Sequence, residues 1–188
     1  MKSILHLKFI VLYIIFGFLC IFTTATLGDE LIQNRLEYDT SRTLYREATL
    51  IASDYLPSYF TEDSSVQSVQ AQLAAMRLYL DSSLWFVSSD GTLITSSNLE
   101  GTSSPKAIED FDPAEIGGNQ YITGTYHGYF DEDMITVMAP VTQGFSTKGY
   151  LLIHSPMSSI EENCSDIMFS VYICLAVIFL LSLIFLLG

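Results

Sequence analysis

The sequence is poor in basic residues, and this shortage argues against several classes of partner. Lys and Arg number 8 against 21 Asp and Glu, and the formal net charge is -13 at pH 7. All the acidic residues lie within the segment 28–166, together with six of the basic ones. Nucleic acids and anionic lipid surfaces attract basic proteins, so we expect no nucleic-acid partner. The acidic segment either recognises a cation or cationic peptide, or is acidic only because an exported domain must stay soluble.

Cysteine is also scarce, with 3 in the whole chain. Cys20 and Cys174 lie inside two long apolar runs, and Cys164 lies just before the second run. Since the segment 28–166 holds only one of them, no disulfide can staple it internally. Cys164 either cross-links two copies of the chain at a membrane surface or is an inert thiol.

Motifs of catalysis are missing. The sequence has no Gly-rich phosphate loop, no Cys or His pair at metal-ligand spacing and no nucleophile elbow. It therefore indicates no catalytic residue, and we expect no cofactor. The stretch IHSPMSSI (153–160), which contains His154, weakly resembles the phospho-acceptor box of kinases, but the acidic residue and the Arg/Lys-Thr-Pro spacing of that box are absent. We interpret His154 as a strand residue close to the membrane.

Two long apolar runs, 9–27 and 167–187, are the strongest feature that is present. At about 1.5 Å per residue, the second reaches roughly the 30 Å thickness of a bilayer's hydrocarbon core. We expect two transmembrane helices, in contact with membrane lipid. Lys2 and Lys8 precede the first, and the positive-inside rule then places residues 1–8 in the cytoplasm. The segment 28–166 becomes an extracytoplasmic domain of a two-pass cell-membrane protein, and the end of the second span returns to the cytoplasm.

The first run has alternative interpretations. Thr23, Thr24 and Ala25 form a tolerable signal-peptidase site, and Cys20 invites a lipoprotein interpretation. Leu19, however, occupies the position where lipoprotein processing requires a small residue. We favour an uncleaved anchor, because the helical pattern continues through the candidate cleavage site.

That continuation predicts a long helix beyond the first span. Leu31, Tyr38, Tyr45 and Ala52 recur every seven residues, and a second set follows at the intervening steps of three and four: Asn34, Ser41, Ala48 and Tyr55. No Gly follows Gly28 and no Pro precedes Pro57, which should end the helix. We expect the helix to pack its own domain on one side and a second subunit on the other. Leu31, Tyr38, Tyr45 and Ala52 are the predicted dimer and signalling residues.

The rest of the domain predicts a second helix and then strands. The helix should cover 65–80, capped from within 61–64. Strands are expected at 84–87 and 92–95, joined by an Asp90-Gly91 turn, and later at 121–129, 134–141 and 150–154. Between them, 96–118 should be a loop with a helical turn around 106–111. The fold class is α+β, with two transmembrane helices flanking a domain that has a long N-terminal helix and about five antiparallel strands.

The order of these parts is familiar. The hairpin LWFVSSDGTLITSSN (84–98) and the strand pair ITVMAPV (135–141) and GYLLIHSPMSSI (149–160), running into a second span, resemble a Cache-type sensor domain, an extracytoplasmic PAS-like domain. Such domains occur in bacterial membrane-bound sensor histidine kinases, and chemoreceptors and diguanylate cyclases carry similar ones. The resemblance is best over 84–160. The HAMP linker, phospho-accepting helix and ATP-binding domain that follow the second span in those kinases do not occur in this sequence.

The resemblance implies the signal-sensing input region of a two-component sensor histidine kinase, passing an extracytoplasmic stimulus across the membrane by helix movement. The parent protein would then be the enzyme, with its kinase output outside this chain. A second hypothesis, of another class, is a non-catalytic membrane-anchored binding or accessory protein.

Candidate binding residues follow from the PAS-like fold, which holds ligands between the sheet and its covering loops. Five side chains either line such a pocket for a small molecule or peptide, or simply fill the core: Trp85, Tyr121, Tyr126, His127 and Tyr129. Asp131 and Asp133, with Glu132 between them, either coordinate a cation through carboxylate oxygens or form a solvated turn. His127 is also a candidate pH sensor.

Overall fold

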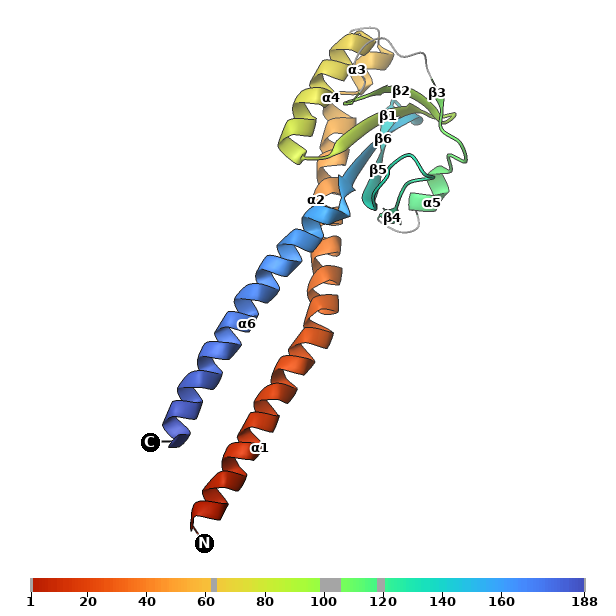
Figure 1. Cartoon of the computed structure of the whole chain (residues 1–188). Helices are drawn as coiled ribbons and strands as arrows, with labels where there is room; N and C mark the ends of the chain where they lie inside the picture. The colour runs from red at the N-terminus through yellow and green to blue at the C-terminus, as the bar shows by residue number, and fades with distance from the viewer. Residues whose placement is uncertain (1, 62–63, 99–105, 118–120, 188) are drawn as a thin grey trace. The chain divides into compact units, whose positions relative to one another are not determined.

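The computed structural model describes residues 2–61, 64–98, 106–117 and 121–187 of the 188-residue chain (Figure 1). The chain divides into two compact units, one formed by residues 1–36 and 159–188 and the other by residues 37–158. We describe each unit by itself.

The first unit is helical. It contains α1 (Lys2–Thr23), the π-helical segment η1 (Thr24–Gly28), the start of α2 (Asp29–Asp54) and most of α6 (Met157–Leu187). Among the described residues, two helices are long and apolar enough to cross a membrane, one beginning at residue 8 and the other at residue 157. The first apolar run thus continues into α2 without a break in helical conformation, as the sequence predicted.

The π-helical segment has a local cause in its threonines. The Thr24 hydroxyl donates to the carbonyl oxygen of Cys20 at 2.9 Å, and the Thr26 hydroxyl donates to that of Phe22 at 3.0 Å. Side-chain donors of this kind compete with the backbone ladder and bend helices. The wider turn lies at the carboxyl end of the predicted first span.

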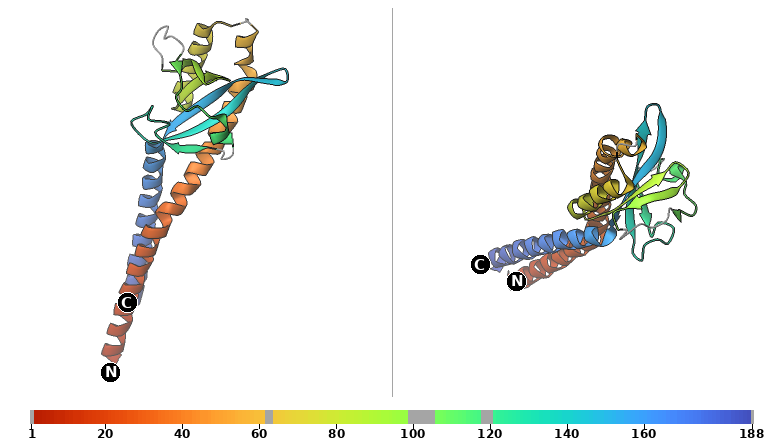
Figure 2. Two further views of the ribbon diagram at one scale, coloured as in Figure 1. Left: turned by 90° about the vertical axis from the view of Figure 1, so that its right-hand side faces the viewer. Right: turned by 90° about the horizontal axis from the view of Figure 1, so that it is seen from above.

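The described residues of the second unit form one sheet of six strands, in the order β3-β2-β1-β6-β5-β4, with every neighbouring pair antiparallel. The strands are β1 (Ser83–Ser88), β2 (Thr92–Ser96), β3 (Lys106–Ala107), β4 (Ile122–Gly124), β5 (Met134–Gln143) and β6 (Ser146–Pro156). The sheet is curled, and the long β5–β6 hairpin extends beyond its neighbours (Figure 2). The unit's other helices are α3 (Pro57–Phe60), α4 (Val66–Leu80) and α5 (Pro113–Gly117).

The two faces of the sheet are covered differently. On β1, Phe86 packs edge-on against Tyr59 and Phe60 of α3, while its neighbour Trp85 packs against Tyr126. Successive side chains on a strand point to opposite faces. The helical cover therefore lies on one face, and the turn around residue 126 lies on the other. Trp85 belongs to a core cluster on that second face, with Val87, Ile108, Ile116, Tyr126, Met138 and Leu152.

Several expectations need correction in detail. The sheet has six strands rather than about five, because Lys106–Ala107 pairs with β2 as a short strand where we expected a helical turn. The strand predicted over 121–129 covers only Ile122–Gly124. Pro57 does not end the long helix, which stops at Asp54. It instead begins α3, where its missing N–H and fixed φ suit the first helical position.

The second helix matches its prediction closely, and its cap is Ser65. The Ser65 hydroxyl oxygen accepts from the Ser68 backbone N–H at 3.2 Å. Of the predicted caps, Glu62 and Asp63 lie outside the described residues. So do residues 99–105 and 118 of the predicted loop 96–118.

Candidate functional site

The second unit contains an open cleft of about 790 Å³ at the β4 edge of the sheet. Its walls come from Tyr38 of α2, Glu115 of α5, Thr136 of β5 and the continuous stretch 121–127, which includes β4. Since β4 pairs only with β5 among the described strands, its outer backbone edge is also available at the cleft.

Hydroxyl groups dominate the chemistry of the lining. They come from three tyrosines and three threonines: Tyr38, Tyr121, Tyr126, Thr123, Thr125 and Thr136. The ionisable partners are Glu115 and His127, whose Oε2 and Nε2 atoms lie 3.4 Å apart. No Lys or Arg is among the described lining residues. The cleft therefore offers many hydrogen-bonding groups and no fixed positive charge for an anion.

The turn from Gly124 to Gly128 has an unusual backbone. Gly124 and Gly128 have φ of 130° and 76°, and between them Tyr126 and His127 have φ of 45° and 55°. Positive φ is costly for a bulky side chain and is held only when surrounding contacts enforce it. The Tyr126 ring supplies such contacts, because it packs against Trp85 and His154. Burial, followed by the nearby Glu115 carboxylate, raises the pKa of Tyr126 well above its usual value.

Behind Tyr126 lies a buried histidine. His154 of β6 is directly paired with Thr136 of β5, and its Nδ1 atom lies 2.8 Å from the Thr136 hydroxyl. Its ring is surrounded by Trp85, Tyr126 and Phe130, with centroid distances of 4.7, 4.7 and 4.9 Å. Complete burial lowers the pKa of His154 to about 3, so the imidazole is neutral.

The five predicted binding residues divide into two groups. Tyr121, Tyr126 and His127 line the cleft. Trp85 lies behind Tyr126 in the core, where it packs against Tyr129 at a ring-centroid distance of 5.4 Å. The Tyr129 hydroxyl accepts from the Glu109 backbone N–H at 3.2 Å, and its ring faces the Lys106 ammonium.

Sequence reasoning missed much of the lining. Glu115 lies in a stretch taken as loop, and Thr136 looked like one residue of a plain apolar strand. Tyr38 was predicted at a subunit contact, yet it lines the cleft. His154 is on a strand, as interpreted, but is fully buried beneath the cleft wall. Its strand pairing with Thr136 was the available signal, and it required the β5–β6 register.

The acidic turn does not form a metal-binding group. Asp131, Glu132 and Asp133 are all exposed, and within the described part of the chain no three His, Cys, Asp or Glu side chains are grouped to hold a metal ion. The Glu132 carboxylate instead accepts from the Ser158 hydroxyl at 3.0 Å, and the Asp133 carbonyl accepts from the Met157 N–H at 2.9 Å. These bonds tie the turn to the start of α6.

The long helix α2 turns only part of its heptad pattern outward. Leu31, Tyr38 and Tyr45 are 69, 41 and 43 % exposed, whereas Ala52 is 1 % exposed. Ala52 therefore has no surface to offer a second subunit. The reason is the 3.6-residue period, which places it on the inward stripe with Ser41, Leu44, Ala48 and Ile51.

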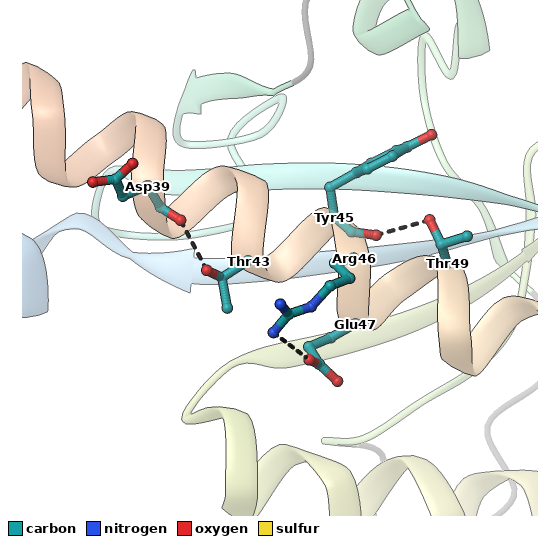
Figure 3. Close-up of polar contacts among 6 residues, drawn as sticks. All are labelled: Asp39, Thr43, Tyr45, Arg46, Glu47 and Thr49. Carbon is teal, nitrogen blue, oxygen red and sulfur yellow. Dashed lines mark hydrogen bonds and ion pairs between the residues drawn. The ribbon is translucent and has the colours of Figure 1, made fainter.

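Polar groups near the outward positions are satisfied within α2 itself (Figure 3). The Thr43 and Thr49 hydroxyls donate to the carbonyl oxygens of Asp39 and Tyr45, at 2.9 and 2.8 Å. Arg46 and Glu47 form an ion pair of 3.2 Å.

Comparison with known proteins gives a likeness of fold. No protein-family model matches the sequence, and no curated protein matches it. Among solved structures, the chain is similar to the sensor domain of the Vibrio cholerae histidine kinase DctB, with a TM-score of 0.52 and 17 % identity. The match covers 74 % of this chain and 59 % of the DctB domain. The chain thus spans less than two thirds of that domain's length.

Another similar structure is the ligand-binding domain of the Campylobacter jejuni chemoreceptor Tlp3 in complex with L-valine. Its TM-score is 0.49 and its identity 14 %, and the match covers 76 % of this chain and 66 % of that one. The DctB likeness is one of fold alone, an α+β domain with a long N-terminal helix and an antiparallel sheet, which agrees with the fold class predicted from the sequence.

Proposed function

We propose that the chain is the signal-sensing input region of a two-component sensor histidine kinase. The observation that carries the proposal is the cleft at the β4 edge, on a domain with a sensor fold that two apolar helices precede and follow in the sequence. In this proposal the cleft binds a small extracytoplasmic molecule, and both ends of the chain lie in the cytoplasm.

The lining supports one kind of ligand over another. Six hydroxyl-bearing side chains and one carboxylate favour a neutral or cationic molecule with several hydrogen-bonding groups. An anion would lie close to Glu115 with no Lys or Arg in the described lining to balance it. We therefore propose that anionic ligands are discriminated against.

Few residues along the chain separate the cleft-lining strands from α6, which contains the predicted second span. Thr136 lines the cleft and contacts His154, and β6 passes from Pro156 directly into the first residue of α6. The 133–157 backbone bond also holds the start of α6. A ligand that shifts β5 and β6 would bias the position of α6, and we propose that helix movement within a homodimer carries the signal.

A thermal-shift screen of the full chain in lipid nanodiscs tests the binding step. The panel comprises amino acids, amines, carboxylates, divalent cations and short peptides. A ligand that binds the folded form raises its Tm with concentration. We expect a neutral or cationic molecule to raise the Tm of the wild type, and the same molecule to leave the Tm of Glu115→Gln or Thr123→Val unchanged.

The matched control is Glu109→Gln, which neutralises an exposed carboxylate outside the described lining and should keep the hit. A panel without any concentration-dependent shift would count against ligand sensing in this cleft. For the kinase step, the chain is joined after residue 187 to the output region of a known histidine kinase. The confirmed ligand should then change autophosphorylation, and an unresponsive chimera that still binds it contradicts the input role.

A further inference from the structure

One buried polar atom beside the cleft has no partner in the described chain. Nδ1 of His154 contacts the Thr136 hydroxyl, but Nε2 of the same ring, fully buried, contacts no hydrogen-bonding group among the described residues. Buried polar atoms in native proteins are nearly always hydrogen-bonded, and an exception calls for an explanation. Here the ring is held between Trp85, Tyr126 and Phe130.

Tyr126 separates this histidine from the cleft. Residue 126 belongs to the cleft lining, and its ring packs against His154 at a ring-centroid distance of 4.7 Å. Thr136 touches both spaces as well, through its place in the lining and its contact with Nδ1. The floor of the cleft and the histidine are therefore one side chain apart.

The backbone that carries Tyr126 is strained and has open space around it. Tyr126 and His127 are held at positive φ, which strains both residues, and Gly124 and Gly128 stand at the two ends of the turn. Neither glycine has another atom within 4 Å of the position a Cβ would take, so the turn has open space at both ends.

We propose that Tyr126 is a displaceable plug, and that the ligand's own ring takes its place and hydrogen-bonds Nε2 of His154. The chemical class is a flat, uncharged ring that carries an O–H, an N–H or a ring nitrogen. A flat ring fits because the space vacated has the shape of a phenol ring, edge-on to Trp85 at 82°. The inference rests on the proposed ligand-sensing function and identifies the inner recognition group of its cleft.

The ring must be uncharged because its new neighbours would be aromatic carbons and a neutral imidazole. Two tautomers satisfy the contact with Thr136. Either the Thr136 hydroxyl donates to Nδ1 and Nε2–H donates to the ligand, or Nδ1–H donates to Thr136 and Nε2 accepts. A hydroxyl group on the ring suits both, since it donates and accepts.

The test uses phenol and benzene as probes, which differ only by that hydroxyl. Trp85, the chain's one tryptophan, packs against both Tyr126 and His154 and reports binding through its emission. The full chain in nanodiscs is titrated with each probe as wild type, Tyr126→Ala, Tyr126→Phe and the pair Thr136→Val/His154→Leu. The last variant removes both polar groups, so that neither is left unpaired.

If the proposal holds, Tyr126→Ala binds phenol about tenfold or more tightly than wild type, because the closed state no longer competes. Tyr126→Phe keeps the plug and should bind like wild type. Every variant that binds phenol should bind it more tightly than benzene, except Thr136→Val/His154→Leu, which should bind the two probes with equal affinity. If Tyr126→Ala does not unfold cooperatively, Tyr126→Leu replaces it, since leucine keeps an apolar contact and vacates the ring position.

Three results would overturn the proposal. They are no saturable phenol response in either wild type or the open variant, equal responses to phenol and benzene, and a phenol advantage that survives without His154. Phenol binding requires no signalling output. A chimera whose autophosphorylation responds to no ligand would therefore contradict the proposed kinase-input function, while phenol binding at His154 could still be observed.

Discussion

Gly17 of α1 lies directly against the ring of Phe179 of α6. A Cβ atom at residue 17 would overlap Cε2 of Phe179 and lie 2.6 Å from its Cδ2. Tyr13, one helical turn earlier, stacks on the same ring with centroids 5.0 Å apart. Eleven residues after Gly17, Gly28 faces Met168, which lies eleven residues before Phe179. The two contacts are consistent with one antiparallel register, in which each glycine of the first helix packs against a large side chain of α6.

Substitution of Gly17 should therefore loosen this helix pair. In membranes, small residues let helices approach closely, and the contact depends on packing rather than on the hydrophobic effect. We expect Gly17→Leu to destabilise the helical unit by about 1–3 kcal/mol, as overpacking does in a tight contact. Denaturation of the full chain in bicelles with SDS, followed by helix content, measures it.

The second-site variant Phe179→Ala should recover much of that loss in the Gly17→Leu background, since it removes the overlapping ring. Phe185→Ala is the matched control, because Phe185 is exposed. If both alanine variants restore stability equally, the Gly17–Phe179 contact is not the cause.

Gly149 should be the most sensitive glycine of the sheet. It lies on β6 opposite β1, and a Cβ there would lie 2.5 Å from the Val87 carbonyl oxygen and 3.3 Å from Phe86 Cε2. Backbone cannot yield as a side-chain end can, so we expect Gly149→Ala to cost about 1–3 kcal/mol of unfolding free energy. Thermal unfolding followed by Trp85 emission measures it. The exposed neighbour Lys148→Ala should change stability by no more than about 0.5 kcal/mol, and equal losses would contradict the close approach.

Local patterns were enough to predict much of this fold. The Asp90-Gly91 turn between apolar stretches predicts the β1–β2 hairpin, and Gly91 has the positive φ, 85°, that such turns require. The helix over 66–80 and the unbroken helix beyond the first apolar run follow from periodicity and from where Gly and Pro are absent. These features depend on neighbours in sequence.

The parts that escaped prediction depend on contacts distant in sequence. Residues 125–129 alternate like a strand, yet they form a turn because Tyr126, Tyr129 and Phe130 pack on Trp85. Lys106 and Ala107 pair with β2 although two residues carry no periodicity. Ala52 fits a heptad and is nevertheless buried, because only the packed domain selects which side of α2 turns inward. His154 acquired its surroundings from the β5–β6 register and the folded turn together.

The thiol of Cys164 should be unreactive. Its side chain is 7 % exposed, Sγ lies 3.9 Å from the Asp29 carbonyl oxygen, and burial together with the Asp29 charge raises its pKa. Thiolate is the reactive form, so alkylation by iodoacetamide should be slow. Two single-cysteine chains are compared by mass spectrometry, both with Cys20 and Cys174 replaced by serine. The first keeps Cys164, and the second carries Cys164→Ser together with Ser165→Cys at the exposed neighbouring position. Cys164 should be alkylated several-fold more slowly than the cysteine at position 165. Equal rates would mean that Cys164 is open to solvent and suited to cross-linking.

Single cysteines placed along α2 should cross-link in a pattern set by exposure. In the proposed homodimer, positions 31, 38 and 45 are outward and positions 48 and 52 are inward. We expect oxidation in membranes to yield disulfide dimers at the first group and not at the second, in a chain freed of its native cysteines. Strong cross-linking at Ala48 or Ala52, or none at all, would contradict a dimer formed through this helix face.

Stability below neutral pH should depend on His154. The folded state holds its pKa at about 3 against 6.5 for the ordinary side chain, so between these values the unfolded chain binds a proton that the folded chain does not. This penalty is absent above pH 6.5 and grows as pH falls towards 3, by about 1.4 kcal/mol per pH unit. Thr136→Val/His154→Leu lacks the titrating group, and its other ionisable residues are unchanged. Chemical unfolding across this range should therefore show wild type losing stability faster than the variant on acidification. Parallel curves for the two proteins would mean that the imidazole takes up a proton in the folded state, and that the aromatic surroundings do not keep it neutral.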